Sequence, residues 1–184
     1  MNKTALLLLA NGFEEIEAIA VIDILRRGNV TLTTASIHSK HVSGAHRLTV
    51  EADQLISNCV NQSYDIVILP GGEPGVTNLS ENEDAIDIIR NQHSQNKLIG
   101  AICAAPRILD SLGLLDGRIA TSYPANKADM IHCTYSEDTV VQDGNIITSR
   151  APGTAMAFAY HILDALDLSP EATALRKGML FQTS

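Results

Sequence analysis

A cysteine stands where a predicted strand ends and a predicted helix begins. The apolar segment Lys97–Ile102 runs into Cys103-Ala104-Ala105-Pro106, whose small residues let the backbone turn sharply. The turn resembles the nucleophile elbow that hydrolases build around a serine. Free N–H groups at a helix start stabilise a thiolate, so we expect a lowered pKa for the Cys103 thiol. The alternative is a buried, unreactive cysteine, the usual state of a free thiol.

Glu17 is the second residue whose position suggests chemistry. It lies one residue before Ala18 and four before Val21, and therefore on or beside the apolar stripe of a predicted helix. A carboxylate that points toward a core is costly unless it is paired or protonated. Near the thiol, Glu17 could donate a hydrogen bond and move a proton. The alternative is a helix-flank residue that reaches solvent, with Glu14 and Glu15 serving the helix cap and dipole.

Two loops could complete a pocket around these side chains. Pro70-Gly71-Gly72 closes a predicted strand, and glycines there let backbone N–H groups approach an oxyanion. Ser149–Thr154 also ends a strand and starts a helix, so it could line a pocket or an interface. Each loop taken alone is equally typical of an ordinary turn.

The other charged and metal-binding residue types give weaker signals. Arg26, Arg27 and Arg47 would form an anion site if the fold brought them together, and are otherwise solvated surface charges. The six histidines show no metal-ligand spacing, so we predict no metal site. The three cysteines are odd in number and widely spaced, which fits neither a disulfide framework nor a zinc site.

Strand and helix signals alternate along the whole chain. This alternation predicts a three-layer α/β/α sandwich with a mostly parallel sheet, in which the reactive crevice lies beyond the carboxyl ends of the strands. Capping boxes are expected at Asn11 and Ser80 and an N-cap at Ser169. Residues 40–57 are read as a hairpin or excursion. The predicted strands are 4–10, 30–35, 65–69, 97–102, 118–121, 139–142 and 145–148, and the main helices are 11–28, 80–93, 105–112 and 154–166, with a short last helix after 169.

Length and composition fit one globular domain over residues 1–184, because 45% of the residues are hydrophobic and 18% are charged. The net charge of −8 argues against nucleic acid and against an anionic membrane as partners. The longest early apolar run, Ala5–Ala10, is too short to span a membrane and lacks the flanks of a signal peptide. We therefore expect a cytoplasmic protein.

Four motifs in register resemble one family. Gly12–Glu17, Leu69–Gly72, Gly100–Pro106 and Thr148–Thr154 match, in order and spacing, the ThiJ/PfpI superfamily, in the branch of the Parkinson's-disease protein and bacterial YajL. The resemblance covers nearly the whole chain. It implies a flavodoxin-like homodimer that needs no cofactor and carries a redox-active, nucleophilic cysteine.

The resemblance also implies roles for individual residues. Cys103 would be the reactive cysteine and Glu17 the acid that is hydrogen-bonded to it. The N–H groups of Gly72 and Ala104 would form an oxyanion pocket, with Gly71 and Tyr123 beside it. Arg27 and Arg47 match arginines near the dimer interface. The activities implied are conversion of methylglyoxal to lactate, repair of glycated proteins, protection against oxidative stress and chaperone action.

The sequence departs from the family pattern beside the cysteine. Animal members carry a His-Pro pair where this chain has Tyr123-Pro124, and a tyrosine of ordinary pKa is no base at neutral pH. Proton handling then shifts to Glu17 or water. The protease-like branch has a histidine directly after the cysteine, whereas this chain has Ala104, which argues against a peptidase. No downstream His-x-Glu completes an amidotransferase triad.

Three functions stay open from the sequence. The first is an enzyme acting on α-oxoaldehydes or on glycated proteins, in which the Cys103 thiolate adds to the carbonyl and Glu17 moves the proton. The second is a non-enzymatic redox sensor or chaperone that is oxidised at Cys103. The third is an inactive scaffold whose function is its dimer surface.

Overall fold

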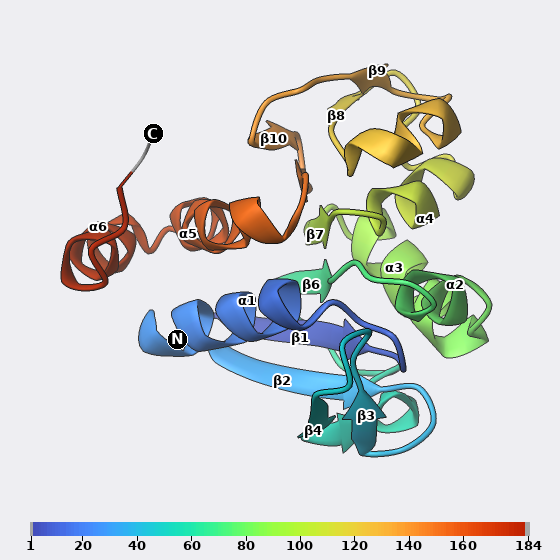
Figure 1. The fold of residues 1–184 in the computed structure, drawn as a ribbon, viewed down its shortest axis with the longest axis horizontal. Coiled ribbons are helices and arrows are strands. Elements are labelled where there is room, and N and C mark those ends of the chain that lie inside the picture. Colours follow the sequence, from blue (N-terminus) through green and yellow to red (C-terminus); the bar gives the residue numbers. More distant parts are fainter. Residues whose placement is uncertain (1, 183–184) are drawn as a thin grey trace.

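The computed structural model describes residues 2–182 and has a central sheet of seven strands with helices on both faces (Figure 1). Met1, Thr183 and Ser184, the ends of the predicted domain 1–184, lie outside the described residues. The sheet order is β10-β11-β7-β6-β1-β2-β5, and every pairing is parallel except β10 with β11. The predicted three-layer, flavodoxin-like arrangement is confirmed. The strands of this sheet are β1 (Thr4–Leu9), β2 (Thr31–Ser36), β5 (Gln54–Leu55), β6 (Ile66–Leu69), β7 (Leu98–Ile102), β10 (Val140–Asp143) and β11 (Ile146–Ser149).

Strand β1 explains why a continuous apolar run forms a central strand. Successive side chains point to opposite faces of a sheet, so both faces need apolar residues when helices cover both. Leu7 and Leu9 pack in the cluster under α1, α5 and α6, whereas Leu6 and Leu8 pack under α2, α3 and α4. The helices are α1 (Glu15–Arg27), α2 (Gly75–Ser80), α3 (Glu83–Ser94), α4 (Pro106–Ser111), α5 (Ala155–Ala165) and α6 (Ser169–Gly178). Among the described residues, no helix has the length and apolar character needed to cross a membrane.

All three predicted helix caps are wrong in position. Helix α1 is capped by the Glu14 side chain, which accepts the Glu17 N–H at 2.8 Å, because the turn at Asn11-Gly12 delays the helix start. Asn11 accepts the Ser43 N–H instead. Ser80 ends the unpredicted helix α2, and Asn82 caps α3 through the Ala85 N–H. The last helix has Ser169 as its first residue and Leu168 as its cap, without a side-chain hydrogen bond.

Residues 40–57 contain a hairpin followed by the sheet edge. Strands β3 (His41–Ser43) and β4 (Thr49–Glu51) pair antiparallel, and β5 then joins β2. The predicted strand 118–121 shortens to β8 (Ile119–Ala120), which pairs with β9 (Thr134–Tyr135) outside the central sheet. Three short 3-10 helices were not predicted; they are η1 (Ile56–Asn58), η2 (Pro124–Asp129) and η3 (Pro152–Thr154).

Candidate active site

Cys103 lies at the sharp turn between β7 and α4, as the sequence predicts. Its φ of 63° is in the left-handed region, which costs a non-glycine residue energy unless the surroundings hold it. Two neighbouring segments hold it here. The Cys103 N–H donates to the Ser149 carbonyl at 3.1 Å, and the Cys103 carbonyl accepts the Tyr123 N–H at 2.8 Å. The side chain is buried, with 9% of the residue exposed.

Glu17 points into the crevice beside this thiol and is fully buried. One carboxyl oxygen, Oε2, accepts the Gly71 N–H at 2.8 Å. The other, Oε1, is buried and has no hydrogen-bond partner among the described residues. The carboxyl and the Cys103 thiol are neighbours in the crevice, because a Cβ at Gly71 would lie 2.6 Å from both Glu17 Oε2 and Cys103 Cβ, and each group shifts the pKa of the other. The prediction that Glu17 faces inward, and not solvent, is therefore confirmed.

Gly71 is the residue that lets the two side chains meet. A Cβ atom at this position would lie 2.6 Å from the Cys103 Cβ and 2.6 Å from Glu17 Oε2. Gly72 has a φ of 93°, and a Cβ there would lie 2.4 Å from the Glu14 nitrogen. The paired glycines thus bring the end of β6 against both β7 and the start of α1. No larger residue leaves room for this approach.

The prediction of a lowered thiol pKa is wrong. Burial, and then the neighbouring Glu17 carboxylate, raise the pKa of the Cys103 thiol, and hydrogen bonds from the N–H groups of Ala104 and Gly72 only partly oppose this. The dipole of α4 stabilises the thiolate less than expected, because this helix has only six residues and begins at Pro106, three residues after the cysteine. Hydrogen bonds from the N–H groups of Gly72 and Ala104 thus lower the thiol pKa without reversing its direction, and their role as an oxyanion pocket stays a prediction.

Burial raises the pKa of Glu17 to about 7, against hydrogen bonds from Cys103 and Gly71 that lower it. Two acidic groups that touch in a buried crevice cannot both carry a charge without a large electrostatic cost. The thiol and carboxyl therefore titrate as a pair. Once the pH rises past about 7, the pair holds one proton and one negative charge.

Tyr123 contacts the site through its backbone. Its N–H fixes the Cys103 carbonyl, while its side chain is exposed, with 43% of the residue accessible. It begins the loop that continues into the 3-10 helix η2. Tyr123 thus borders the crevice at the position where the animal members of the family carry a histidine.

The fold does not bring the three arginines together. Arg26 pairs with Asp53 at 2.7 Å and Arg27 with Asp23 at 2.8 Å, both at the last turn of α1. Arg47 lies in the turn of the β3–β4 hairpin, which packs against the first turn of α1 through Glu15. The two ends of this helix are roughly 18 Å apart at 1.5 Å per residue. The conditional anion site is therefore absent within the described chain.

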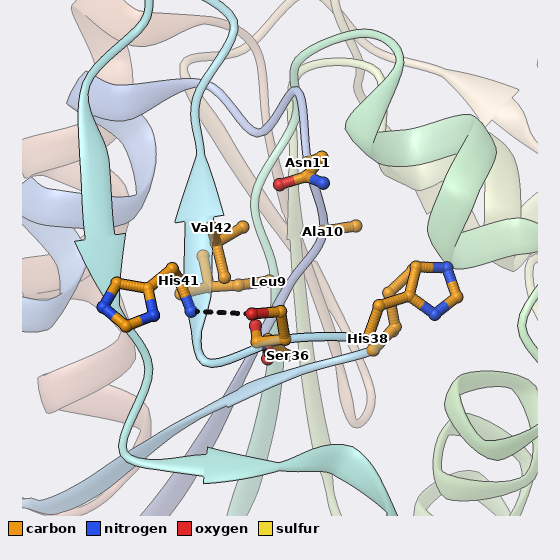
Figure 2. A pocket seen from close by; sticks show the side chains of 9 residues that line it. Leu9, Ala10, Asn11, Ser36, His38, His41 and Val42 are labelled. Carbon is orange, nitrogen blue, oxygen red and sulfur yellow. Dashed lines mark hydrogen bonds between the residues drawn. The ribbon is translucent and has the colours of Figure 1, made fainter.

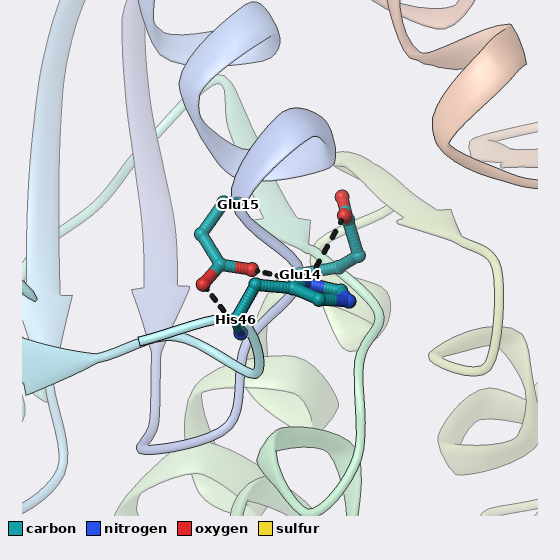
Figure 3. Close-up of side chains that lie close together, drawn as sticks. All are labelled: Glu14, Glu15 and His46. Carbon is teal, nitrogen blue, oxygen red and sulfur yellow. Dashed lines mark hydrogen bonds and ion pairs between the residues drawn. The ribbon is translucent and has the colours of Figure 1, made fainter. Parts of the chain in front are cut away.

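A cluster of Glu14, Glu15 and His46 places metal-binding atoms within 4.8 Å of one another (Figure 3). The two carboxylates of the cluster already accept hydrogen bonds from other groups. Glu15 accepts the His46 N–H at 2.6 Å and contacts His46 Nδ1 at 2.9 Å, while Glu14 caps α1. We assign the cluster to anchoring the hairpin. Sequence spacing did not reveal it because 31 residues separate Glu15 from His46.

A second group of polar residues lies at the carboxyl ends of β1 and β2 (Figure 2). The cavity there measures about 10 Å³, the space of one water molecule. His38 and His41 point away from each other across it, and the Ser39 hydroxyl accepts the His41 N–H at 3.3 Å. This cavity is too small for a substrate or cofactor.

The fold and the crevice define a class: flavodoxin-like α/β proteins with a buried cysteine at a strand-to-helix turn and a glutamate beside it. The DJ-1/PfpI family model matches residues 3–165. The chain belongs to the DJ-1/PfpI family.

Relatives and solved structures agree with this assignment. The chain is 38% identical to Drosophila melanogaster protein dj-1beta over 183 residues, which is 98% of each chain. The crystal structure of that protein superimposes with a TM-score of 0.96 and full coverage of both chains. A Caenorhabditis elegans protein named a glutathione-independent glyoxalase is 35% identical, covering 94% of this chain and 92% of its own. A Pyrococcus abyssi protein named a deglycase is 35% identical, covering 83% and 93%.

Proposed function

We propose that this protein removes reactive α-oxoaldehydes such as methylglyoxal without a cofactor, and that the same site acts on glycated proteins. The observation that supports this most strongly is the buried contact between Cys103 and Glu17, in which the carboxyl has a pKa of about 7. A group with that pKa both accepts and returns a proton efficiently at neutral pH. The glyoxalase and deglycase names of two relatives support the same chemistry.

The first step forms a bond between sulfur and carbon. The Cys103 thiolate attacks the aldehyde carbon of methylglyoxal, and the carbonyl electron pair moves to the oxygen. The N–H groups of Gly72 and Ala104, whose hydrogen bonds lower the thiol pKa, would stabilise the charge that develops on this oxygen. Protonation of this oxygen gives a hemithioacetal. Because the attack is made by the thiolate, Cys103 must lose its proton before turnover begins.

The next steps move one proton and consume one water molecule. Glu17 takes the proton from the former aldehyde carbon, which gives an enediol, and returns a proton to the neighbouring carbon. The first carbon is thereby oxidised to a thioester and the ketone is reduced to an alcohol, so no external redox partner is needed. Water then hydrolyses the thioester to lactate and frees Cys103. Glu17 carries this proton transfer because Tyr123 replaces the histidine.

Two variants and one control test the proposal. Methylglyoxal turnover should vanish in Cys103→Ser and fall by about a hundredfold or more in Glu17→Gln, since general acid–base groups contribute on this order. Cys133→Ser should retain the wild-type rate, because Cys133 lies by Met130 and Asp110, away from the crevice. Wild-type turnover no faster than background would refute the proposal.

The second candidate function is redox sensing at the same cysteine. Peroxide would oxidise the thiolate to a sulfenate with loss of water, and a second peroxide would give a sulfinate. Two backbone N–H groups and the unpartnered Glu17 Oε1 suit the added oxygens. Mass spectrometry after mild peroxide should find the oxygens on Cys103. Equal oxidation of Cys59 and Cys133 would exclude this function.

We also propose that the protein forms a homodimer. Ile16 and Ile19 on α1 and Leu48 on the hairpin are exposed, at 58%, 39% and 52%. These side chains project from adjacent elements, and burying them against a second copy would remove apolar surface from water. Sedimentation of the wild type should give a dimer mass, and Ile16→Asp should shift it toward the monomer. A monomeric wild type would refute this. A cytoplasmic location stays a prediction from the sequence.

A further inference from the structure

We propose that Arg107 is a positioning residue, which holds the two backbone segments whose N–H groups face the Cys103 sulfur. This inference rests on the proposed function, because it assigns a role to those N–H groups in the reaction. The segments are Gly71-Gly72-Glu73, at the end of β6, and Ala104-Ala105-Pro106, at the start of α4. They are joined through the side chain of Arg107.

Arg107 binds the α4 segment through the residue that follows the cysteine. Its Nε donates to the Ala104 carbonyl at 3.2 Å, and its backbone N–H donates to the same carbonyl at 3.3 Å. A hydrogen bond from the Ala104 N–H lowers the pKa of the Cys103 thiol, as does one from Gly72. The orientation of the Ala104 backbone is therefore fixed by two contacts from one residue.

Arg107 binds the β6 segment through Glu73, which directly follows Gly72. Arg107 Nη2 and Glu73 Oε1 form an ion pair. Glu73 is itself held, because its Oε2 accepts the Thr77 hydroxyl at 2.9 Å and the Thr77 N–H at 3.3 Å. The Arg107 guanidinium thus connects the Glu73 carboxylate, which follows Gly72, to the carbonyl of Ala104.

A third segment approaches the same guanidinium. Asp129 Oδ2 lies 3.8 Å from Arg107 Nη1, at the end of the 3-10 helix η2 that follows Tyr123. Arg107 and Asp129 line a cavity of about 280 Å³, and their side chains are 29% and 53% exposed. Polar contacts from one guanidinium therefore reach all three segments. A planar guanidinium with five donors suits this geometry, whereas a lysine ammonium does not.

The alternative is an ordinary surface ion pair. The Arg107 and Glu73 side chains are 29% and 47% exposed, and such pairs contribute little to stability. Replacing either residue should therefore leave the protein folded, so an effect on the thiol can be measured. The Arg176–Asp164 pair, with exposures of 30% and 35%, lies on α6 and α5 and provides a matched control.

The experiment measures Cys103 alkylation by iodoacetamide against pH, located by mass spectrometry, in the wild type, Glu73→Ala, Arg107→Ala and Arg176→Ala. Loss of the Glu73 negative charge alone would ease thiolate formation and speed alkylation. If the N–H groups of Gly72 and Ala104 also become less well held, they stabilise the thiolate less and alkylation slows. We expect Glu73→Ala and Arg107→Ala to slow alkylation at neutral pH by about tenfold, because removing such a donor outright costs on the order of a hundredfold. Both should move the midpoint of the pH–rate curve upward, with Arg176→Ala unchanged.

Alkylation of Glu73→Ala as fast as the wild type or faster overturns the inference. So does a lowered melting temperature with an unchanged midpoint, which a purely structural role would produce. Failure of the proposed function gives a different result: the wild type would then be alkylated at Cys103 without converting methylglyoxal. In that case the midpoint of the alkylation pH–rate curve in Glu73→Ala still tests the role of Arg107.

Discussion

Two carboxylates that lie two residues apart on α1 have opposite properties. Glu15 faces the hairpin and Glu17 faces the crevice, and both are buried. Burial also raises the pKa of Glu15, but hydrogen bonds from the His46 ring and from backbone N–H groups outweigh it, and the net shift is downward. Glu17 has one such N–H donor, from Gly71, and its pKa rises to about 7.

The difference shows what separates an anchoring acid from a reactive one. A carboxylate with two or more donors is stable in its charged form and holds its partners in place. A carboxyl with too few donors keeps its proton until neutral pH, and can then exchange it with a substrate. Burial contributes to the difference, because Glu17 is fully buried whereas Glu15 keeps 8% of its surface exposed. The number of donors around each carboxyl adds to it, because Glu15 accepts from His46 and Leu48 whereas Glu17 has one N–H donor, from Gly71.

The largest effect expected from this comparison is on turnover. Glu17→Gln should lower the methylglyoxal turnover number by about a hundredfold or more, because the proton carrier is lost. Glu15→Gln, which changes the same chemical group two residues away, should leave turnover within a few-fold of the wild type. Steady-state assays on the two purified variants make the comparison. Equal losses in both would mean that the pKa difference has no role in the chemistry.

The next effect is on stability against pH. Between pH 4.5 and 7 the folded protein holds a proton on Glu17 that the unfolded chain has lost, so the free energy of unfolding falls as pH rises through this window. Relative to Glu17→Gln, the wild type should lose on the order of 3 kcal/mol across it. Urea unfolding at several pH values measures the difference. Parallel curves for the two proteins would contradict a raised pKa.

Glu17 and Glu15 each lie against a glycine, so an alanine at either glycine tests how closely the two carboxylates are packed. A Cβ at Gly71 would lie 2.6 Å from Glu17 Oε2, and one at Gly44 would lie 2.3 Å from Glu15 Oε1. Both alanine variants should be destabilised, by about 1–3 kcal/mol, as overpacked sites are. Only Gly71→Ala should also lose turnover. Thermal melts with parallel assays check this, and Gly153→Ala, whose Cβ meets nothing within 4 Å, is the control.

The smallest effect concerns His46. Its hydrogen bond to Glu15, and then the charge of Glu15, raise the pKa of His46. The stabilisation from this pair is fully present below the ordinary histidine pKa of about 6.5 and is lost as pH rises through the raised value. The melting temperature of His46→Ala should therefore fall below wild type at acidic pH and approach it at alkaline pH. His41→Ala, on the same hairpin, is the control for loss of a histidine side chain.

Local patterns predicted the part of the site that nearby residues determine. The apolar run of β1, the small residues around Cys103 and the apolar stripe beside Glu17 place the thiol and the carboxyl at one sheet edge. Parallel strands bring their carboxyl ends together, so the order of elements along the chain was enough to predict the crevice. The N–H groups of Gly72 and Ala104 were predicted from the resemblance to the family, and not from the order of elements.

Contacts between distant residues determine what the sequence did not reveal. The direction of the thiol pKa depends on how deeply Cys103 is buried and on a carboxylate 86 positions away in the chain (103 − 17). The Glu15–His46 anchor and the Arg107–Glu73 ion pair join segments 31 and 34 residues apart. Helix α2 was missed because Ser80 was read as the start of one helix when it is the end of another.

The central claim is that Cys103 and Glu17 share one proton around neutral pH. Alkylation of Cys103 followed across pH, in the wild type and in Glu17→Gln with Cys103→Ala as the blank, tests it most directly. The account predicts a step in the wild-type rate with its midpoint near 7, where the pair loses its first proton, and no such step in Glu17→Gln. The same midpoint in both proteins, near the ordinary thiol value of about 8.5, would contradict it.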